Sequence, residues 1–151
     1  MLIAALIASQ VPVPPLRVRV GNGSEALVRV VDDRSSGYRL KVDCVKRCGR
    51  PLHHSAPVGD TPMSLVDLHR DGLVYSSWGT GCCYLARVLK VTAAGVVTLF
   101  ERGSREVPSL ITSPALTVVT YVRPTDGSGR ETSMTAKPVR WTYRHGRFER
   151  S

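Results

Sequence analysis

Apolar and polar residues alternate with a period of two along most of this chain. In YRLKVDC (38–44) every second residue is apolar, and Arg39 and Lys41 fall between them. PVRWTYR (138–144) repeats the pattern, with Trp141 and Tyr143 on the apolar side. Such alternation predicts strands with one face in the core and one in water, and here the wet faces are basic.

Further stretches rich in Val, Leu, Thr and Tyr are separated by turn sequences such as GNGS, TAAG and RHGR. They predict strands at 16–20, 25–31, 73–78, 82–91, 95–101 and 116–123. The apolar spacing of a helix is almost absent, and the only helical candidate is a turn near 62–68. We therefore predict one antiparallel all-β domain over residues 11–151, built as a sandwich, a barrel or a partial propeller.

Residues 45–62 show no period and contain three prolines, which predicts a long loop. Loops of this length in compact domains are often functional or held by a crosslink. This one contains Cys48 and the doublet His53 and His54.

Charge is concentrated in two segments of a chain that has 21 basic and 12 acidic residues. Segments 34–50 and 130–151 each contain six Lys or Arg, against one acid and two acids respectively. If the two segments adjoin in the fold, they form one basic face that attracts an anionic partner. The alternative is two separate, solvated strand faces. The partner-binding candidates are Arg39, Lys41, Lys46, Arg47, Arg50, His53, His54, Arg140, Arg144 and Arg147.

The first eight residues, MLIAALIA, are apolar and precede Ser9, Gln10 and a proline-rich stretch. The run is too short for a transmembrane helix, and the sequence has no basic residue before Arg17. It predicts that residues 1–10 are a truncated export signal and that the protein is periplasmic or secreted. A short buried strand of a cytosolic protein is the alternative.

Four cysteines fit an oxidising compartment, where disulfides persist. Cys44 can reach Cys48 only if the chain bends sharply at 45–47, and a bridge between the adjacent Cys82 and Cys83 brings its Cα atoms unusually close. Geometry therefore favours bridges from the first pair to the second, which would fasten the 45–62 loop to the strand beginning at Cys82. The sequence does not say which cysteine joins which.

Metal sites have weaker support. Cys44, Cys48, His53 and His54 lack the ligand spacing of defined zinc modules. Asp67, His69, Asp71 and Gly72 occupy the first positions of a calcium-loop pattern, although His69 stands where a carboxylate or amide belongs. An ordinary turn explains the same residues. We predict no cofactor.

The segment LVDLHRDGLVYSSWGTGCCYLARVLKVTAAGVVTL (65–99) resembles blades of FG-GAP or VCBS-like β-propeller proteins, in which an aspartate-rich loop precedes two strands. Asp67, Asp71, Gly72 and the strand 73–75 carry this resemblance, and His69 departs from it. Exported proteins of this type include periplasmic lysozyme-inhibitor-like immunity proteins. The resemblance implies an exported β binding module.

Catalysis is not predicted, because the chain has neither G-x-S-x-G nor H-E-x-x-H; His53 and His54 are the remaining acid–base candidates. The final hairpin places Trp141, Tyr143 and Phe148 among arginines, a pattern suited to stacking on nucleic-acid bases. Alternation instead assigns Trp141 and Tyr143 to the core.

Our first hypothesis is a binding module for another protein or an anionic envelope polymer, for example an inhibitor or immunity-type protein acting on an envelope hydrolase. That hydrolase would have to be acidic or neutral, because a basic lysozyme would be repelled. The alternative is a polyanion- or nucleic-acid-binding protein that uses segments 34–50 and 130–151.

Overall fold

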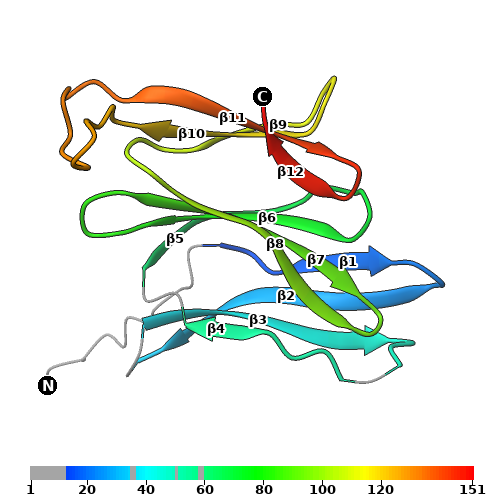
Figure 1. The fold of residues 1–151 in the computed structure, drawn as a ribbon. Helices are drawn as coiled ribbons and strands as arrows, with labels where there is room; N and C mark the ends of the chain where they lie inside the picture. Colours follow the sequence, from blue (N-terminus) through cyan, green and yellow to red (C-terminus); the bar gives the residue numbers. More distant parts are fainter. Residues whose placement is uncertain (1–12, 35–36, 50, 58–59) are drawn as a thin grey trace, which may run out of the picture.

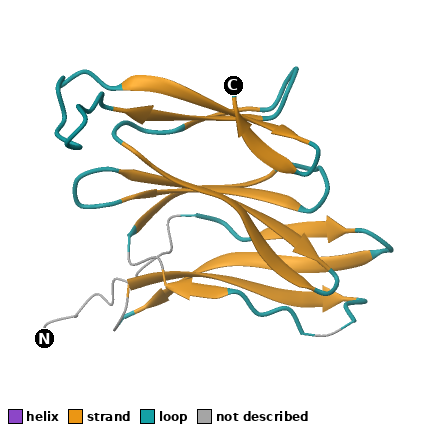
Figure 2. Ribbon diagram, viewed as in Figure 1, coloured by secondary structure: helices purple, strands orange, loops and turns teal. Residues whose placement is uncertain are grey.

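The structure, a computed structural model, describes residues 13–34, 37–49, 51–57 and 60–151. All regular elements in this part of the chain are strands (Figure 2). Within the described ranges no helix is long and apolar enough to cross a membrane. The antiparallel all-β prediction is therefore confirmed. The predicted export signal, residues 1–10, and Arg50 lie outside the described residues.

Twelve strands form three four-stranded antiparallel sheets, each made of four consecutive strands (Figure 1). Sheet A contains β1 (Leu16–Val20), β2 (Ser24–Asp33), β3 (Gly37–Lys46) and β4 (Ser55–Pro57). Sheet B contains β5 (Thr61–Asp67), β6 (Leu73–Gly79), β7 (Tyr84–Thr92) and β8 (Gly95–Ser104). Sheet C contains β9 (Ser109–Ile111), β10 (Thr117–Val122), β11 (Lys137–Arg144) and β12 (Arg147–Arg150).

The sheets are stacked face to face in chain order, with sheet B in the middle (Figure 1). One apolar core lies between sheets A and B and includes Val28, Val42 and Trp78. A second core lies between sheets B and C and includes Val88 and Phe100. Each sheet has two edge strands, so none closes into a barrel. The structure is a stack of three antiparallel sheets with an apolar core on each side of the middle one.

Strand β6 has no polar face because it belongs to the middle sheet, which is covered on both sides. Its alternate residues Val74 and Trp78 enter the core shared with sheet A, whereas Leu73 and Tyr75 enter the core shared with sheet C. The buried indole Nε1 of Trp78 donates a hydrogen bond to Ser76 Oγ at 3.0 Å. A strand buried on both faces reads as a nearly continuous apolar run, which is the pattern of LVYSSW.

Two predictions of secondary structure were wrong. Residues 62–68 are not a helical turn, because most of them belong to β5, an edge strand that pairs with β6 around a bulge between Pro62 and Ser64. Edge strands tolerate proline, and the bulge interrupts the period-two pattern. The predicted 45–62 loop contains the short strand β4, which pairs with residues 39–41 of β3.

Candidate functional site

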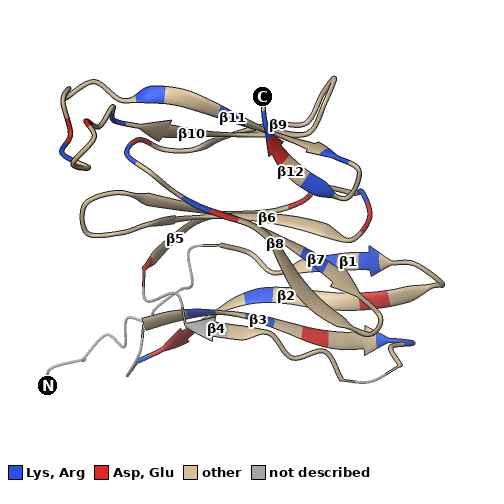
Figure 3. Cartoon of the chain, viewed as in Figure 1, with Lys and Arg blue, Asp and Glu red and all other residues tan. Residues whose placement is uncertain are grey.

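The two basic segments do not adjoin. Segment 34–50 contains β3 of sheet A, and segment 130–151 contains β11 and β12 of sheet C, so the whole of sheet B separates them. Figure 3 shows their basic residues at opposite ends of the stack. The hypothesis of a single basic face composed of both segments is therefore wrong, because the stacking order of sheets is not encoded in the alternation of either strand.

Each outer sheet instead has its own basic face. On β3, Arg39 and Lys41 alternate with the buried Leu40 and Val42, so they point away from the core. Strands β1 and β2 alternate in the same way and add Arg17, Arg19 and Arg29 to the same face. Arg29 lies directly opposite Lys41 across the β2–β3 ladder. We call these five residues the sheet A basic face.

Sequence reasoning missed the three arginines from β1 and β2. The signal was present, because LRVRV (16–20) and LVRVV (27–31) show the same alternation of apolar and basic residues as β3. The net charge of these segments is low because acidic residues lie close by in the chain, so a search for basic segments did not find them. Net charge per segment does not show which residues share a face, whereas alternation does.

The sheet A basic face is of mixed sign. Arg17 pairs with Glu25 at 3.2 Å, Arg29 with Asp43 at 3.3 Å, and Arg39 Nε with Asp33 at 2.9 Å. These pairs are partly exposed, and such pairs contribute at most about 1 kcal/mol each to stability. Among the described residues Arg19 and Lys41 have no ion-pair partner on this face.

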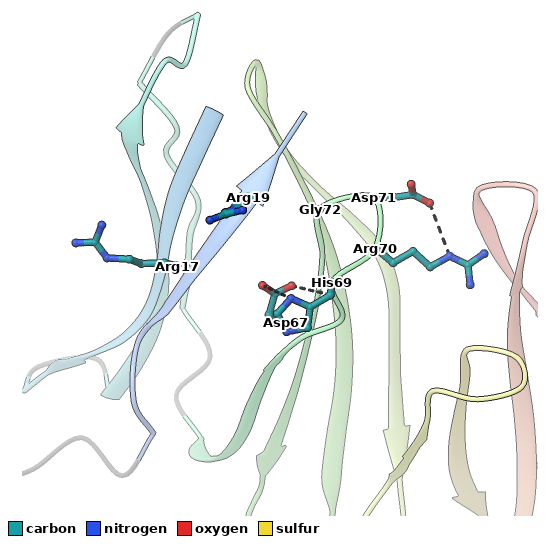
Figure 4. A pocket seen from close by; sticks show the side chains of 7 residues that line it. All are labelled: Arg17, Arg19, Asp67, His69, Arg70, Asp71 and Gly72. Carbon is teal, nitrogen blue, oxygen red and sulfur yellow. Dashed lines mark hydrogen bonds and ion pairs between the residues drawn. The ribbon is translucent and has the colours of Figure 1, made fainter. Parts of the chain in front are cut away.

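A pocket of about 420 Å³ lies between β1, at the edge of sheet A, and the β5–β6 turn of sheet B (Figure 4). Arg17 and Arg19 of β1 form one side, and the β5–β6 turn forms the other. Arg70, although it lines the pocket, extends toward sheet C, where its guanidinium lies 5.1 Å from the centre of the Tyr143 ring. Arg17 pairs with Glu25 and Arg70 with Asp71, so Arg19 is the lining arginine that has no ion-pair partner among the described residues.

The β5–β6 turn is the segment that matched part of a calcium loop. Asp67 Oδ1 accepts a hydrogen bond from the backbone N–H of His69 at 2.8 Å, and His69 Nδ1 lies 3.4 Å from the other carboxylate oxygen. The carboxylates of Asp67 and Asp71 point to different sides of the turn (Figure 4). Within the described ranges no three His, Cys, Asp or Glu residues are grouped to hold a metal ion. The geometry is that of a turn closed by its own aspartate.

The disulfides differ from the predicted pairing. Cys44 is bonded to Cys48 and Cys82 to Cys83, with Cα–Cα distances of 6.0 and 3.8 Å. The first bridge is possible because the chain reverses sharply at Arg47, whose φ is 52°. No bridge joins the 45–62 loop to β7, so the predicted fastening of that loop is wrong.

His53 is exposed, whereas His54, the residue before β4, is partly buried. Burial, and secondarily the guanidinium of Arg87, lowers the pKa of His54 below its usual value. Arg87 is itself buried and pairs with Glu101 at 2.8 Å across the β7–β8 ladder. The neighbouring charge that acts on the pKa of His54 is therefore a guanidinium.

The aromatic residues of the final hairpin belong to the core between sheets B and C. Tyr143 is buried, and Trp141 and Phe148 pack against the same cluster. The Phe100 ring lies 5.6 Å from Trp141 and 5.1 Å from Phe148, centre to centre. Alternation therefore assigned Trp141 and Tyr143 correctly. These rings are not arranged as a surface platform for bases.

The remaining candidates are dispersed. Lys46 and Arg47 lie at the exposed end of β3, where the Arg47 carbonyl accepts a hydrogen bond from Ser24 Oγ at 2.5 Å. Arg140, Arg144 and Arg147 lie on the outer face of sheet C, opposite the aromatic side. Arg147 pairs there with Glu149 at 2.8 Å.

Comparisons with models of known protein families, with curated proteins and with solved structures found no match. The resemblance to FG-GAP and VCBS-like blades therefore stays a prediction.

Proposed function

We propose that this protein is an exported β binding module that recognises the acidic surface of another protein through the sheet A basic face. The observation that carries the proposal is that Arg17, Arg19, Arg29, Arg39 and Lys41 lie on one side of three adjacent strands. A sheet holds these basic side chains at fixed spacing. A partner with carboxylates at matching positions is attracted to the face and is held in one alignment on it.

The mixed sign of the face favours a protein over a uniform polyanion. Glu25, Asp33 and Asp43 are interspersed among the cations and would repel a chain of regularly spaced phosphates. A folded partner can place its own basic residues opposite these acids. An inhibitor or immunity-type module acting on an acidic or neutral envelope hydrolase fits this chemistry, and the two disulfides fit export.

Polyanion or nucleic-acid binding is the second candidate. It is supported by the outer face of sheet C, where Arg140 and Arg144 have no ion-pair partner in the described part of the chain. Phosphate contacts made by such residues alone would give binding that weakens steeply with salt and depends little on the sequence of the nucleic acid.

Two double charge reversals separate the candidates. R19E/K41E changes the unpaired cations of the sheet A basic face, and R140E/R144E is the matched control on sheet C. Envelope proteins from the source cell are captured on the immobilised full chain, and a captured acidic protein is then purified and its Kd measured. We expect R19E/K41E to weaken binding by about ten-fold or more and R140E/R144E to leave it within about two-fold.

Equal losses from both double variants, or none from R19E/K41E, would contradict the proposal. A parallel titration with a single-stranded oligonucleotide and with polyphosphate tests the second candidate. Binding of either polymer that is more sensitive to R140E/R144E and collapses as salt is raised would support that candidate instead.

A further inference from the structure

The Cys82–Cys83 pair lies apart from both apolar cores. It belongs to the turn between β6 and β7, where Cys82 is exposed and Cys83 is half-buried. By contrast, Cys44 and Cys48 pack against the core between sheets A and B. Cys82 is therefore the only exposed cysteine among the four, since Cys44 and Cys48, which line a pocket of about 490 Å³, are half-buried like Cys83.

The turn does not depend on the sulfur–sulfur bond for its shape. The backbone N–H of Thr80 donates to the Cys83 carbonyl at 2.8 Å, and the Cys83 N–H donates to Thr80 Oγ1 at 2.9 Å. These two hydrogen bonds close the turn independently, and β6 and β7 are paired along seven residues beyond it. Opening the bridge therefore requires no separation of the sheets.

Arg105 places a positive charge directly on this pair. Its Nη1 donates to Cys83 Sγ at 3.3 Å. The backbone N–H of Arg105 donates to the Tyr121 carbonyl at 2.7 Å, and its Nη2 pairs with Glu131, which fixes the guanidinium beside the sulfur. Glu131 also accepts from Arg123 Nη1 at 3.1 Å, but among the described residues only Arg105 donates to the Cys83 sulfur.

A pocket of about 260 Å³ opens beside the same sulfur. Cys83 and Gly103 line it together with Arg105, and Tyr121 and Val122 contribute to its largely apolar wall. One end of sheet B thus brings together the exposed Cys82, the half-buried Cys83, the guanidinium of Arg105 and an open pocket. The partner proposed above would bind sheet A, whereas this pair lies at the end of sheet B. The site is therefore independent of the proposed function.

We propose that Cys82 and Cys83 form a thiol–disulfide exchange site whose substrate is an external dithiol. A thiolate of that dithiol attacks Cys82 Sγ, forming a mixed disulfide and breaking the Cys82–Cys83 bond. The electron pair of the broken bond leaves with Cys83 as a thiolate, which the Arg105 guanidinium stabilises. The second thiol of the reagent then loses its proton to water and attacks the mixed disulfide, releasing a cyclic or intramolecular disulfide and the Cys82 thiolate. The reagent is oxidised by two electrons, and the protein pair is reduced by two.

The chemical role of Arg105 follows from the leaving group. Exchange is faster when the departing thiol has a lower pKa, and a neighbouring guanidinium favours the thiolate over the thiol. In the reverse reaction, the reduced Cys82 and Cys83 thiols transfer two electrons to the disulfide of another molecule. The site is therefore suited to equilibrate with dithiols of its compartment while the Cys44–Cys48 bridge stays closed.

The test follows each bridge separately in the oxidised full chain. The protein is incubated with dithiothreitol, quenched with an alkylating reagent at successive times, and digested so that mass spectrometry reports the Cys82–Cys83 and Cys44–Cys48 peptides individually. We expect the Cys82–Cys83 bridge to open at least about ten-fold faster, since exposed bridges are the labile ones.

Three variants assign the role of Arg105. R105Q removes the charge and should slow opening by about three-fold or more, whereas R105K keeps a positive charge and should restore most of the rate. R123Q is the matched control, because Arg123 lines the same pocket and also pairs with Glu131 but makes no hydrogen bond to either sulfur, so its rate should stay near that of the unchanged chain. Thermal melting of each variant shows that the fold is retained.

Two results would overturn the proposal: four free thiols in the chain taken from its native compartment and exposed to oxidant, or opening of the two bridges at similar rates. Equal rates for R105Q and R123Q, with both folded, would remove Arg105 from the mechanism. Because these measurements involve no binding partner, they succeed or fail independently of the charge-reversal experiment.

Discussion

Gly72 in the β5–β6 turn is the glycine of the calcium-like pattern, and its packing gives a sharp prediction. Its φ is +70°, and a Cβ built on it would lie 2.2 Å from the carbonyl oxygen of Val91. The Gly72 carbonyl also accepts a hydrogen bond from the Val91 N–H at 2.9 Å. The turn is therefore pressed against β7 through the backbone of this residue, and G72A should disturb that contact.

Three effects combine in G72A. A side chain in the left-handed region costs about 1–2 kcal/mol. A contact of this closeness with backbone adds about 1–3 kcal/mol, the usual range for overpacking. The loss of freedom in the unfolded chain on replacing glycine offsets about 0.4–1 kcal/mol. We therefore expect the free energy of unfolding to fall by about 2–4 kcal/mol, and Tm by about 10 °C for a chain of this size.

Gly129 supplies the matched control. Its φ is +81°, similar to that of Gly72, but nothing lies within 4 Å of a Cβ built on it. G129A thus carries the conformational cost without the contact, and we expect a loss of about 1 kcal/mol. Urea unfolding followed by fluorescence measures both variants. If G72A and G129A differ by less than about 0.5 kcal/mol, the close approach of the turn to β7 is not what requires glycine.

Two further predictions concern buried polar groups. Because the folded state lowers the pKa of His54, the unfolded chain binds a proton first as pH falls below about 6.5, so stability is present at neutral pH and declines below it. H54Q should flatten this decline in unfolding experiments from pH 7.5 to 5.5, and H53Q, a change at an exposed site, should not; equal slopes in both variants would contradict the assignment. S76A leaves the buried N–H of Trp78 without its acceptor and should cost about 1–3 kcal/mol. That cost should largely disappear in a W78F background, and an unchanged cost in that double-mutant cycle would show that the hydrogen bond does not contribute.

Most of the fold could be predicted from the sequence, because alternation is a local property. The predicted strand at 16–20 coincides with β1, and the clear alternation in 38–44 and 138–144 falls within β3 and β11. The turn sequences between the strands separate them correctly for the same reason. Within each strand, the alternation of apolar and polar residues shows which side chains face a core and which face water.

The candidate site required information that alternation does not contain. Which strands lie beside one another depends on sheet order, and which sheets touch depends on stacking, so the separation of segments 34–50 and 130–151 could not be read from either segment. The arginines of β1 and β2 become part of the site only when the β1–β2–β3 order is known. The strand β5 was missed because Pro62 and the adjacent bulge disrupt the one local signal available.

The disulfides show most clearly how the fold differs from a crosslinked scaffold. A bridge from Cys44 to Cys83 would have closed a long loop and contributed about 4 kcal/mol by reducing the entropy of the unfolded chain, whereas the observed Cys44–Cys48 bridge closes a very short one and contributes about 2 kcal/mol. The bridge between adjacent residues closes the smallest loop of all and contributes less still. Neither bridge joins one sheet to another, so the stack is held together by its two apolar cores. For that reason the Cys82–Cys83 bond can open and close without a large change in the stability of the fold, which is the property that an exchange site requires and a structural staple does not.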